Sequence, residues 1–531
     1  MTALTADDIL ATLPEAPAGP WPGMALAVID KGEVVTRFCH GLASVEHGVP
    51  ITADTVFRIA SVTKQFLCLA VTLLSDEGHF DLDAPLGRYL PELQGVPATA
   101  TLRQAMSNTS GIRDHLELWY LAGGGLPVPH RLADSLRICA QQKQTNFAPG
   151  SGYLYSNANF LLLSRIVEDA AGKPLGDFLK ERFFDPLGMT RTRLRSQHDE
   201  VVPDLATPYV VKDGAIRRGR MTAELWGEGS AMSTLNDLIL WAQYYRKDPQ
   251  GLIARMRQPA TFTNGNKAFY GTGLFVEDWR GYANIGHTGV WPGYHTEIVW
   301  FDQPDLALIC IANANSIYPR EVNRKLAAKL LDAPEPAGIA LDPALWARAA
   351  GFGQWHSPDE LDFIELKEVE GKPHAVIYGG SVPLRGTAPD RFVIDAALSE
   401  YGGFDLSQVA DGVIRATRCN GEPVVFHALD TLPEGAGTAG LVGHWTCPEL
   451  GTPLIVGCTD DGAYTVSTPD YWNHDWVATA LPAGRLLIED STGPWARRFI
   501  LVPGRTEGMT VEEMFVAGPR VRKLAYRRDP A

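Results

Sequence analysis

The sequence predicts a multidomain protein in which an α+β domain is followed by two small antiparallel β-barrel domains. Three observations support this prediction: two strand hairpins bracket a mostly helical segment, a proline-rich stretch follows, and the rest of the chain has short alternating runs with closely spaced turns. The 531 residues correspond to roughly three to four domains of about 150 residues.

The α+β domain is predicted to span residues 1–332. One hairpin joins residues 24–29 to 34–40, and another joins 297–301 to 306–314. The helical patterns between and after these hairpins are 64–74, 160–170, 236–245 and 321–331. Strands at both ends with helices between them predict an antiparallel sheet closed by its N- and C-terminal strands and flanked by helices.

A linker is predicted at residues 333–344, where Pro and Gly are frequent. The two β-barrel domains are then expected at 345–432 and 438–531. Each opens on a similar sequence, Gly-Gln-Trp-His around Trp355 and Gly-His-Trp-Thr around Trp445. We interpret this as a weak internal repeat; the alternative is a chance likeness of a few letters.

Two dipeptides inside these domains are typical of hairpin turns. They are Asn420-Gly421 and Asp461-Gly462.

Charge and hydropathy exclude several function classes. Lys and Arg number 47 against 62 Asp and Glu, so neither a nucleic acid nor an anionic membrane is an expected partner. The longest apolar runs, 66–74 and 306–312, are too short to span a bilayer. The acidic N-terminus does not resemble a secretory signal, and seven scattered cysteines suit free thiols in a reducing cytoplasm. No zinc-type spacing occurs, and no cofactor is implied.

Ser61-Val62-Thr63-Lys64 stands directly before an apolar helical segment. Positions three apart share a helix face, so the Ser61 hydroxyl and the Lys64 amine are expected one turn apart. A helix N-terminus favours an anion beside Ser61, and burial of Lys64 would help it accept the serine proton. The alternative is an N-cap serine and a solvated first-turn lysine.

Tyr155 and Asn157 follow the turn-rich sequence Ala-Pro-Gly-Ser-Gly at 148–152. A tyrosine near a lysine can relay a proton, as a phenolate, from a nucleophile to a leaving group. The Asn157 amide can hold a substrate carbonyl. The alternative for Tyr155 is a half-buried loop residue.

His287-Thr288-Gly289 is expected on the strand before the second hairpin. Gly289 allows a substrate to lie against the strand backbone. The N–H of Val290 is then expected to pair with that of Ser61 as an oxyanion hole. The alternative is that His287 is a structural histidine.

These three elements, in this order and spacing, resemble the penicillin-recognising serine hydrolases, which include class C β-lactamases, DD-peptidases, esterases and D-aminopeptidases. Ser-Asn-Thr-Ser-Gly-Ile at 107–112 and Gly-Ser-Ala-Met-Ser-Thr at 229–234 support the resemblance. It covers residues 20–332 and implies a β-lactamase-like fold there.

The bacterial D-aminopeptidase branch of this family resembles the whole chain, with a similar length and two β-barrels after the catalytic domain. The sequences that also look alike are Asn-x-Ser-Gly-x-Arg-Asp at 108–114, Pro-Gly-Ser at 149–151 and Tyr-Arg-Arg at 526–528.

The resemblance implies a role for each residue. Ser61 is the nucleophile, Lys64 is its activator, and Tyr155 is the general base and acid, with Asn157 beside it. His287 stands where many relatives have a lysine. A lysine at this place favours substrates with a carboxylate after the scissile bond. A mostly neutral histidine argues against a DD-carboxypeptidase or a β-lactamase, and D-aminopeptidases also have histidine at this place.

In the D-aminopeptidase branch a loop of the last barrel reaches the active site and contacts the substrate amino group. The matching stretch is expected at 467–476. A substrate ammonium needs a carboxylate partner, for which Asp475 is the first candidate and Asp470 the second. The alternative is that the aromatic residues of this stretch pack inside the barrel.

The sequence therefore predicts a serine aminopeptidase that removes an N-terminal D-residue from small peptides, amides or esters through an acyl-enzyme. The preference for D-residues rests on the resemblance alone, which also suggests a homodimer and makes β-lactams candidate inhibitors. Two alternatives are an esterase or β-lactam hydrolase on the same scaffold, and a penicillin-binding sensor that does not turn over.

Overall fold

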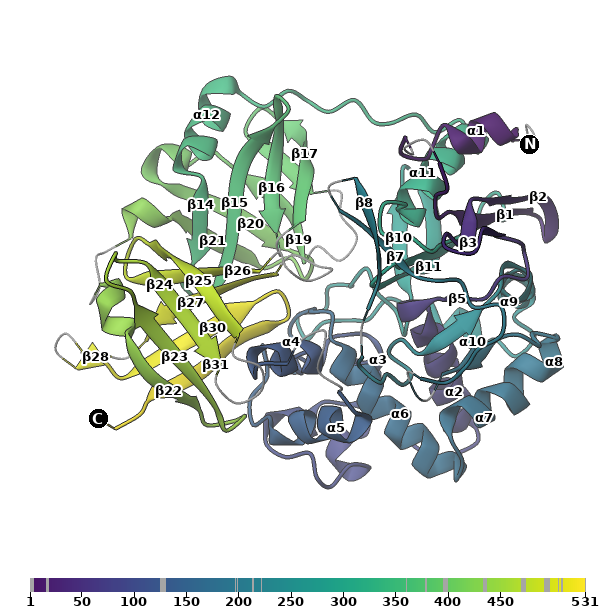
Figure 1. Cartoon of the computed structure of the whole chain (residues 1–531), viewed down its shortest axis with the longest axis horizontal. Coiled ribbons are helices and arrows are strands. Elements are labelled where there is room, and N and C mark those ends of the chain that lie inside the picture. Colours follow the sequence, from purple (N-terminus) through teal and green to yellow (C-terminus); the bar gives the residue numbers. More distant parts are fainter. Residues whose placement is uncertain are drawn as a thin grey trace.

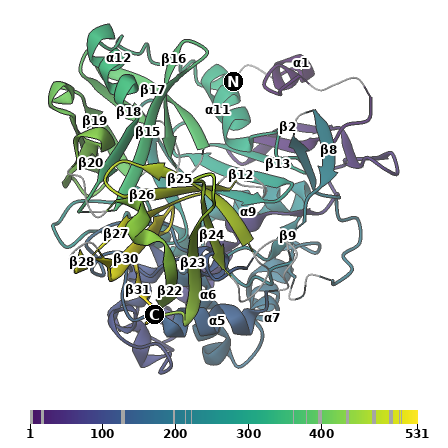
Figure 2. The same ribbon diagram turned by 60° about the vertical axis from the view of Figure 1, so that its left-hand side comes forward.

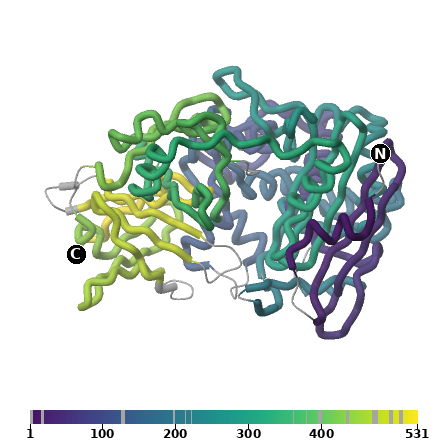
Figure 3. Tube along the Cα trace, turned by 90° about the horizontal axis from the view of Figure 1, so that it is seen from above, coloured from purple at the N-terminus to yellow at the C-terminus, as the bar shows by residue number. Residues whose placement is uncertain are grey.

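A computed structural model of the chain places the α+β domain on one side of the molecule and two β-barrels on the other (Figures 1 and 3). The residues that the structure describes are 4–15, 19–124, 130–195, 197, 199–212, 214–220, 222–359, 361–377, 380–394, 400–432, 437–468, 474–490, 497–504, 506–507 and 510–530.

The α+β domain is built on a six-stranded antiparallel sheet, counted over the described residues. Its strands, in order across the sheet, are β10 (Phe275–Trp279), β11 (Tyr282–Trp291), β12 (Tyr294–Phe301), β13 (Leu306–Ala312), β1 (Met24–Asp30) and β2 (Glu33–His40). Strand β1 pairs with β13 from Met24 opposite Ala312 to Asp30 opposite Leu306. The N-terminal hairpin therefore closes the sheet against the C-terminal strands of the domain, which confirms the predicted arrangement.

The central strands β1 and β13 are buried on both faces, which explains why their sequences are apolar without alternation. Ala27 and Ile309 belong to the core formed with helices α2, α6 and α9. Leu26 and Leu308 lie on the opposite face and pack with Leu326 of α11. The main helices of this domain are α2 (Thr63–Asp76), α4 (His115–Leu121), α5 (Leu132–Gln141), α6 (Asn157–Ala171), α9 (Leu235–Lys247) and α11 (Pro319–Leu330).

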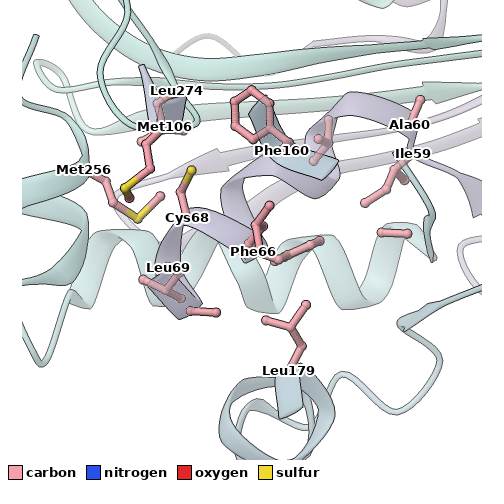
Figure 4. Packing of buried hydrophobic residues seen from close by; sticks show 14 of the residues in the cluster. Ile59, Ala60, Phe66, Cys68, Leu69, Met106, Phe160, Leu179, Met256 and Leu274 are labelled. Carbon is pink, nitrogen blue, oxygen red and sulfur yellow. The ribbon is translucent and has the colours of Figure 1, made fainter. Parts of the chain in front are cut away.

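Helix α2 is the centre of the helical core and is buried from Thr63 to Leu74. Its side chains meet the surrounding elements on several sides (Figure 4). The Phe66 ring contacts Trp241 of α9 edge-on, with 4.5 Å between ring centroids. Packing of this density fixes the axial position of α2, and therefore the position of the residues at its N-terminus.

Two closed antiparallel barrels follow, each of eight strands within the described residues. The first barrel contains β14 (Gln354–Ser357), β15 (Asp362–Val369), β16 (Lys372–Ile377), β17 (Gly380–Ala388), β18 (Arg391–Ile394), β19 (Tyr401–Asp405), β20 (Val413–Arg418) and β21 (Pro423–Ala428). The second barrel contains β22 (Gly443–Cys447), β23 (Thr452–Cys458), β24 (Tyr464–Thr468), β25 (His474–Leu481), β26 (Arg485–Asp490), β27 (Arg497–Pro503), β30 (Glu513–Gly518) and β31 (Val521–Arg528).

The repeated tryptophans occupy matching places in the two barrels. Trp355 lies on β14 and Trp445 on β22, the first strand of each barrel, and both side chains are fully buried. Each indole N–H donates to a backbone carbonyl just upstream, that of Ala349 (3.3 Å) or Leu441 (2.9 Å). The repeat predicted from the sequence thus corresponds to a structural repeat.

The second barrel shares a core with the α+β domain. Trp119 and Tyr120 of α4 belong to the same buried cluster as Trp445 and Phe499, and α4 lies beside β30 and β31 (Figure 1). The two barrels lie side by side (Figure 2), and Arg522 joins them through Glu400 and Asp362 of the first barrel. These buried contacts hold the three parts of the chain in one arrangement.

The seven cysteines all lie in the described part of the chain and are free thiols, as predicted. Among the described residues, no helix has the length and apolar character needed to cross a bilayer.

Candidate active site

Ser61 lies in the short 3-10 turn η1 (Ala60–Val62), which runs directly into α2. Ala60 has φ +47°, a left-handed conformation that costs a non-glycine residue about 1–3 kcal/mol. The turn is held by its buried neighbours Ile59 and Val62, and Ile59 donates its N–H to the Ala231 carbonyl at 3.0 Å. The strained turn therefore presents Ser61, which is only partly buried, at the N-terminus of a fixed helix.

Lys64 lies one turn beyond Ser61 and is fully buried. Its Nζ is 3.0 Å from Ser61 Oγ, 3.0 Å from Asn157 Oδ1 and 2.5 Å from the carbonyl oxygen of Glu228. Burial lowers the pKa of Lys64, although the Glu228 carboxylate opposes this effect. In the amine form, two N–H groups suffice for the two carbonyl-type acceptors, and the lone pair is left to face the Ser61 hydroxyl.

Tyr155 lies on the loop that leads into α6, and its side chain is buried. Its ring centroid is 4.9 Å from Lys64 Nζ. Burial raises the pKa of Tyr155, while a hydrogen bond with Ser61 and the charge of Arg520 act in the opposite direction. The phenol form of Tyr155 therefore dominates in the resting protein, and of the two groups Lys64 is the one available in its unprotonated, basic form.

Asn157 is the first residue of α6 and links Lys64 to a buried carboxylate. Its backbone N–H and its Nδ2 both donate to Asp114 Oδ2, at 2.6 and 2.9 Å. The other oxygen of Asp114 caps α4 by accepting from the N–H groups of Leu116 and Glu117. Burial would raise the pKa of Asp114, but the Arg520 charge and these donors hold it below its ordinary value.

Asn108 explains part of the sequence motif at 107–112. Its φ of +58° is left-handed, a conformation that Asn tolerates better than most residues. In this conformation its side-chain oxygen accepts from the Ser156 N–H (3.0 Å) and from Asn159 (3.1 Å), and its carbonyl accepts from the Leu154 N–H (3.1 Å). Asn108 thus braces the loop that carries Tyr155.

His287 lies on β11 with both ring nitrogens engaged inside the protein. Its Nδ1 donates to the Thr288 carbonyl at 2.5 Å, so its Nε2 accepts from the Tyr270 hydroxyl at 2.9 Å. Burial lowers the pKa of His287 to about 3. The ring lies beside Tyr155, with 6.1 Å between centroids, and is a neutral wall of the site at pH 7.

Strand β11 approaches the Ser61 turn through Gly289. A Cβ atom at Gly289 would lie 2.1 Å from the Ile59 carbonyl oxygen and 3.2 Å from the Ser61 nitrogen. Only glycine permits this close approach of β11 to the backbone of Ser61, and Val290 is the next residue of the strand. Val290 is the exposed neighbour, with 45% of its surface accessible.

The sheet, the helical core and this cluster together match a known family. The β-lactamase family matches residues 8–332. The chain belongs to this family.

Known proteins resemble this β-lactamase family member over its barrels as well. The D-aminopeptidase of Brucella melitensis is 28% identical over 542 aligned residues, which cover 95% of this chain and 96% of that protein.

Two solved structures share the fold. The octameric penicillin-binding protein homologue of Pyrococcus abyssi covers 76% of this chain and 96% of its own, with a TM-score of 0.56 and 20% identity. The D-amino acid amidase of Ochrobactrum anthropi SV3 covers 62% and 98%, with a TM-score of 0.50 and 25% identity.

In this family member both barrels reach the rim of the site by a hairpin turn. The β20–β21 turn of the first barrel places Asn420, whose Nδ2 donates to the Ser151 carbonyl at 2.8 Å. The β30–β31 turn of the second barrel places Arg520, whose Cζ is 5.0 Å from the Tyr155 ring centroid. Asp470 and the side chain of Asp475, predicted to bind the substrate amine, lie outside the described residues.

The structure thus brings together the predicted site residues Ser61, Lys64, Tyr155, Asn157, His287 and Gly289, and Val290 follows Gly289 on β11. Sequence reasoning gave no role to Asp114 or Arg520. Asp114 ends a motif shared with the family, which was a usable signal, whereas the sequence around Arg520 carries none. No group of three or more His, Cys, Asp or Glu among the described residues is arranged to hold a metal ion.

Proposed function

We propose that this β-lactamase family member is a serine hydrolase that removes an N-terminal D-amino acid from small peptides, amides or esters. The observation that carries the proposal is the buried Lys64 amine 3.0 Å from the Ser61 hydroxyl. The substrate class is supported by the D-aminopeptidase and the D-amino acid amidase among its relatives.

In acylation, Ser61 Oγ forms a bond to the substrate carbonyl carbon and its proton passes to Lys64 Nζ. The N–H groups of Ser61 and Val290 hold the oxyanion, next to the backbone approach at Gly289. Tyr155 then donates its phenolic proton to the leaving nitrogen as the C–N bond breaks. The Lys64 ammonium returns a proton to the Tyr155 phenolate, so the protons balance.

In deacylation, water attacks the ester carbonyl of the acyl-enzyme and passes one proton to the Lys64 amine, which later gives a proton back for Ser61. The bond to Ser61 Oγ breaks, Ser61 regains its proton, and the free D-amino acid leaves. No step requires a metal or an organic cofactor.

His287 acts in substrate selection. Because it is buried, neutral and held by Tyr270 and the Thr288 carbonyl, it offers no positive charge to a substrate carboxylate. This supports an amide or a short peptide as substrate over a DD-carboxypeptidase substrate.

Four further parts of the proposal concern the substrate ammonium, the oligomeric state, inhibitors and the location of the protein. Asp475 is the proposed partner of the substrate ammonium, with Asp470 as the second choice. A homodimer and inhibition by β-lactams are proposed from the family resemblance, and a cytoplasmic location from the seven free thiols.

The decisive experiment compares kcat/KM for the p-nitroanilides of D-Ala, L-Ala and N-acetyl-D-Ala. We expect turnover of D-Ala p-nitroanilide, and a loss of at least about a hundredfold for each of the other two. Ser61→Ala should lower kcat/KM by about a thousandfold or more, because the nucleophile and its helpers act as one unit.

The same assays separate the alternatives. Equal rates for D-Ala and L-Ala, or brisk turnover of esters or β-lactams without anilide turnover, would replace the aminopeptidase by an esterase or β-lactam hydrolase. A permanent mass adduct on Ser61 without released amine would identify a sensor.

A further inference from the structure

The β30–β31 turn of the second barrel places a guanidinium group next to the proton-transfer residues. Arg520 Nη1 is 3.7 Å from Asp114 Oδ2, and Arg520 Cζ is 5.0 Å from the Tyr155 ring centroid. The Asp114 side chain is completely buried, whereas 31% of the Arg520 side chain is accessible. The cation therefore lies at the boundary between the buried network and the open side of the site.

The Arg520 side chain is not what docks the turn. The Asn146 side chain donates to the Arg520 carbonyl (3.2 Å) and accepts from the Arg522 N–H (2.7 Å), and the Asp114 N–H also donates to the Arg520 carbonyl (3.4 Å), so the turn is held by its backbone. Nor does Asp114 need the guanidinium for its hydrogen bonds, because four N–H donors already reach its carboxylate. Another reason is needed for a cation at this position.

The charges around Tyr155 supply that reason. The titratable and charged groups that face it, from every element packed against it, are Ser61, Lys64, Asp114, Tyr153, Tyr270, His287 and Arg520. When Tyr155 gives up its proton while Lys64 carries one, the buried phenolate is repelled by Asp114 and attracted by the two cations. Once Lys64 has passed its proton on and is neutral again, Arg520 is the cation that balances the negative charge of Asp114.

We propose that Arg520 is a positioning residue, through which the second barrel stabilises the phenolate of Tyr155 during proton transfer. The inference rests on the role proposed above for Tyr155. The burial that raises the pKa of Tyr155 and the Arg520 charge that opposes it agree with this role. The barrel then supplies part of the catalytic electrostatics, beyond any contact with substrate.

The test uses leaving groups that differ in their need for a proton. We compare kcat/KM for D-Ala p-nitroanilide, whose leaving group departs readily, with D-Ala p-methoxyanilide, whose nitrogen must be protonated. The variants are Arg520→Gln and Arg520→Lys in the full-length protein. Arg527→Gln is the matched control, because Arg527 is exposed on β31, the strand that follows the Arg520 turn.

Arg520→Gln should lower kcat/KM about tenfold for the p-nitroanilide and about a hundredfold for the p-methoxyanilide. Arg520→Lys, which keeps the charge, should recover most of this loss, and Arg527→Gln should leave both values unchanged. The melting temperature should match that of the wild type, because the backbone contacts of Asn146 persist.

An unchanged ratio between the two anilides in Arg520→Gln would overturn the inference, whether or not activity falls, because a substrate-binding or structural role lowers both rates together. Failure of the underlying mechanism has a different signature. If Ser61→Ala keeps its activity, or if no acyl adduct forms on Ser61, the proposed function fails, whatever Arg520 does.

Discussion

Lys64 is the residue on which the chemistry depends, and two buried carboxylates set its charge. Burial lowers the pKa of Lys64, whereas Glu228 and Asp114 raise it. Glu228 accepts the Trp226 N–H at 3.0 Å with one oxygen, while its other oxygen has no hydrogen-bond partner in the described part of the chain. Burial has the opposite effect on Glu228, whose pKa it raises. Lys64 and Glu228 therefore compete for one proton.

A pH profile tests this balance. Because the amine form of Lys64 is the active one, kcat/KM should fall about tenfold per pH unit as the pH drops below the lowered pKa. Glu228→Gln removes an anion that favours the ammonium form, so the pKa of Lys64 should fall further and the acid limb should move to lower pH, by up to about one unit.

The control for this profile is Glu181→Gln, which removes an exposed carboxylate that pairs with Lys173. It should leave the acid limb in place. An acid limb that moves to higher pH in Glu228→Gln would contradict the assignment of Lys64 as the base.

The sequence could predict the reactive residues but not their supports. The spacing of Ser61 and Lys64 on one helix face follows from helix geometry, and the contact at 3.0 Å confirms it. Asp114 acts through Asn157, and Arg520 through Tyr155, across 43 and 365 positions of the chain. The Arg520 contact depends on how the second barrel packs on the α+β domain, which no local pattern encodes, whereas Asp114 at least ends a motif shared with the family.

At the scale of elements, the site depends on two pieces of backbone that nearly touch. Strand β11 pairs with β10 only as far as Gly286, and beyond it the edge of β11 faces the Ser61 turn. The Ser61 turn is strained at Ala60. Strand β11 can lie close to this turn because Gly289 has no side chain. The oxyanion hole proposed here requires both conditions.

Gly289→Ala tests this approach directly. The added Cβ would meet backbone atoms of Ile59, which cannot rotate away, so β11 must retreat from the turn. A displacement of about 1 Å at a reacting centre costs about a hundredfold in rate, and we expect kcat/KM to fall by that factor. Gly351→Ala is the control, because its Cβ would meet nothing within 4 Å. Activity of Gly289→Ala within about threefold of wild type would exclude the proposed oxyanion hole.

The elements themselves were predictable where the pattern was strong. The helix expected at 64–74 is α2, and the hairpins at 24–40 and 297–314 form strands β1, β2, β12 and β13 of the sheet. Helix α4 was not predicted, because its apolar residues surround the helix and cover the second barrel as well as their own domain. The helix predicted at 160–170 begins earlier, at Asn157 of α6, where Asp114 accepts a backbone N–H that the helix start leaves open.

At the scale of the whole molecule, the two barrels position hairpin turns beside the site. Each presents a hairpin turn to the site, with Asn420 from the first barrel and Arg520 from the second. Arg522 ties the barrels together through Asp362 and Glu400, two positions after Arg520. Movement of the second barrel would therefore withdraw the Arg520 turn from Tyr155.

Arg113 joins the second barrel to the α+β domain without contacting the reacting residues. Its buried guanidinium donates to Glu449 (3.1 Å) and to the carbonyls of Arg522 (3.1 Å) and Gln144 (2.8 Å), which spans the α+β domain and the second barrel. Arg113→Met removes all three of these donated hydrogen bonds and leaves a buried gap in the contact between the α+β domain and the second barrel. We expect it to lower the free energy of unfolding by about 3 kcal/mol, measured by urea denaturation.

The same variant should affect catalysis in a particular way. If the second barrel retreats, Arg113→Met should slow D-Ala p-methoxyanilide more than D-Ala p-nitroanilide, as Arg520→Gln does. Arg103→Met is the control, since Arg103 forms an exposed pair with Asp83 that contributes about 0–1 kcal/mol. A destabilised Arg113→Met protein with the wild-type ratio of the two anilides would mean that the barrel holds the fold together but contributes nothing to proton transfer.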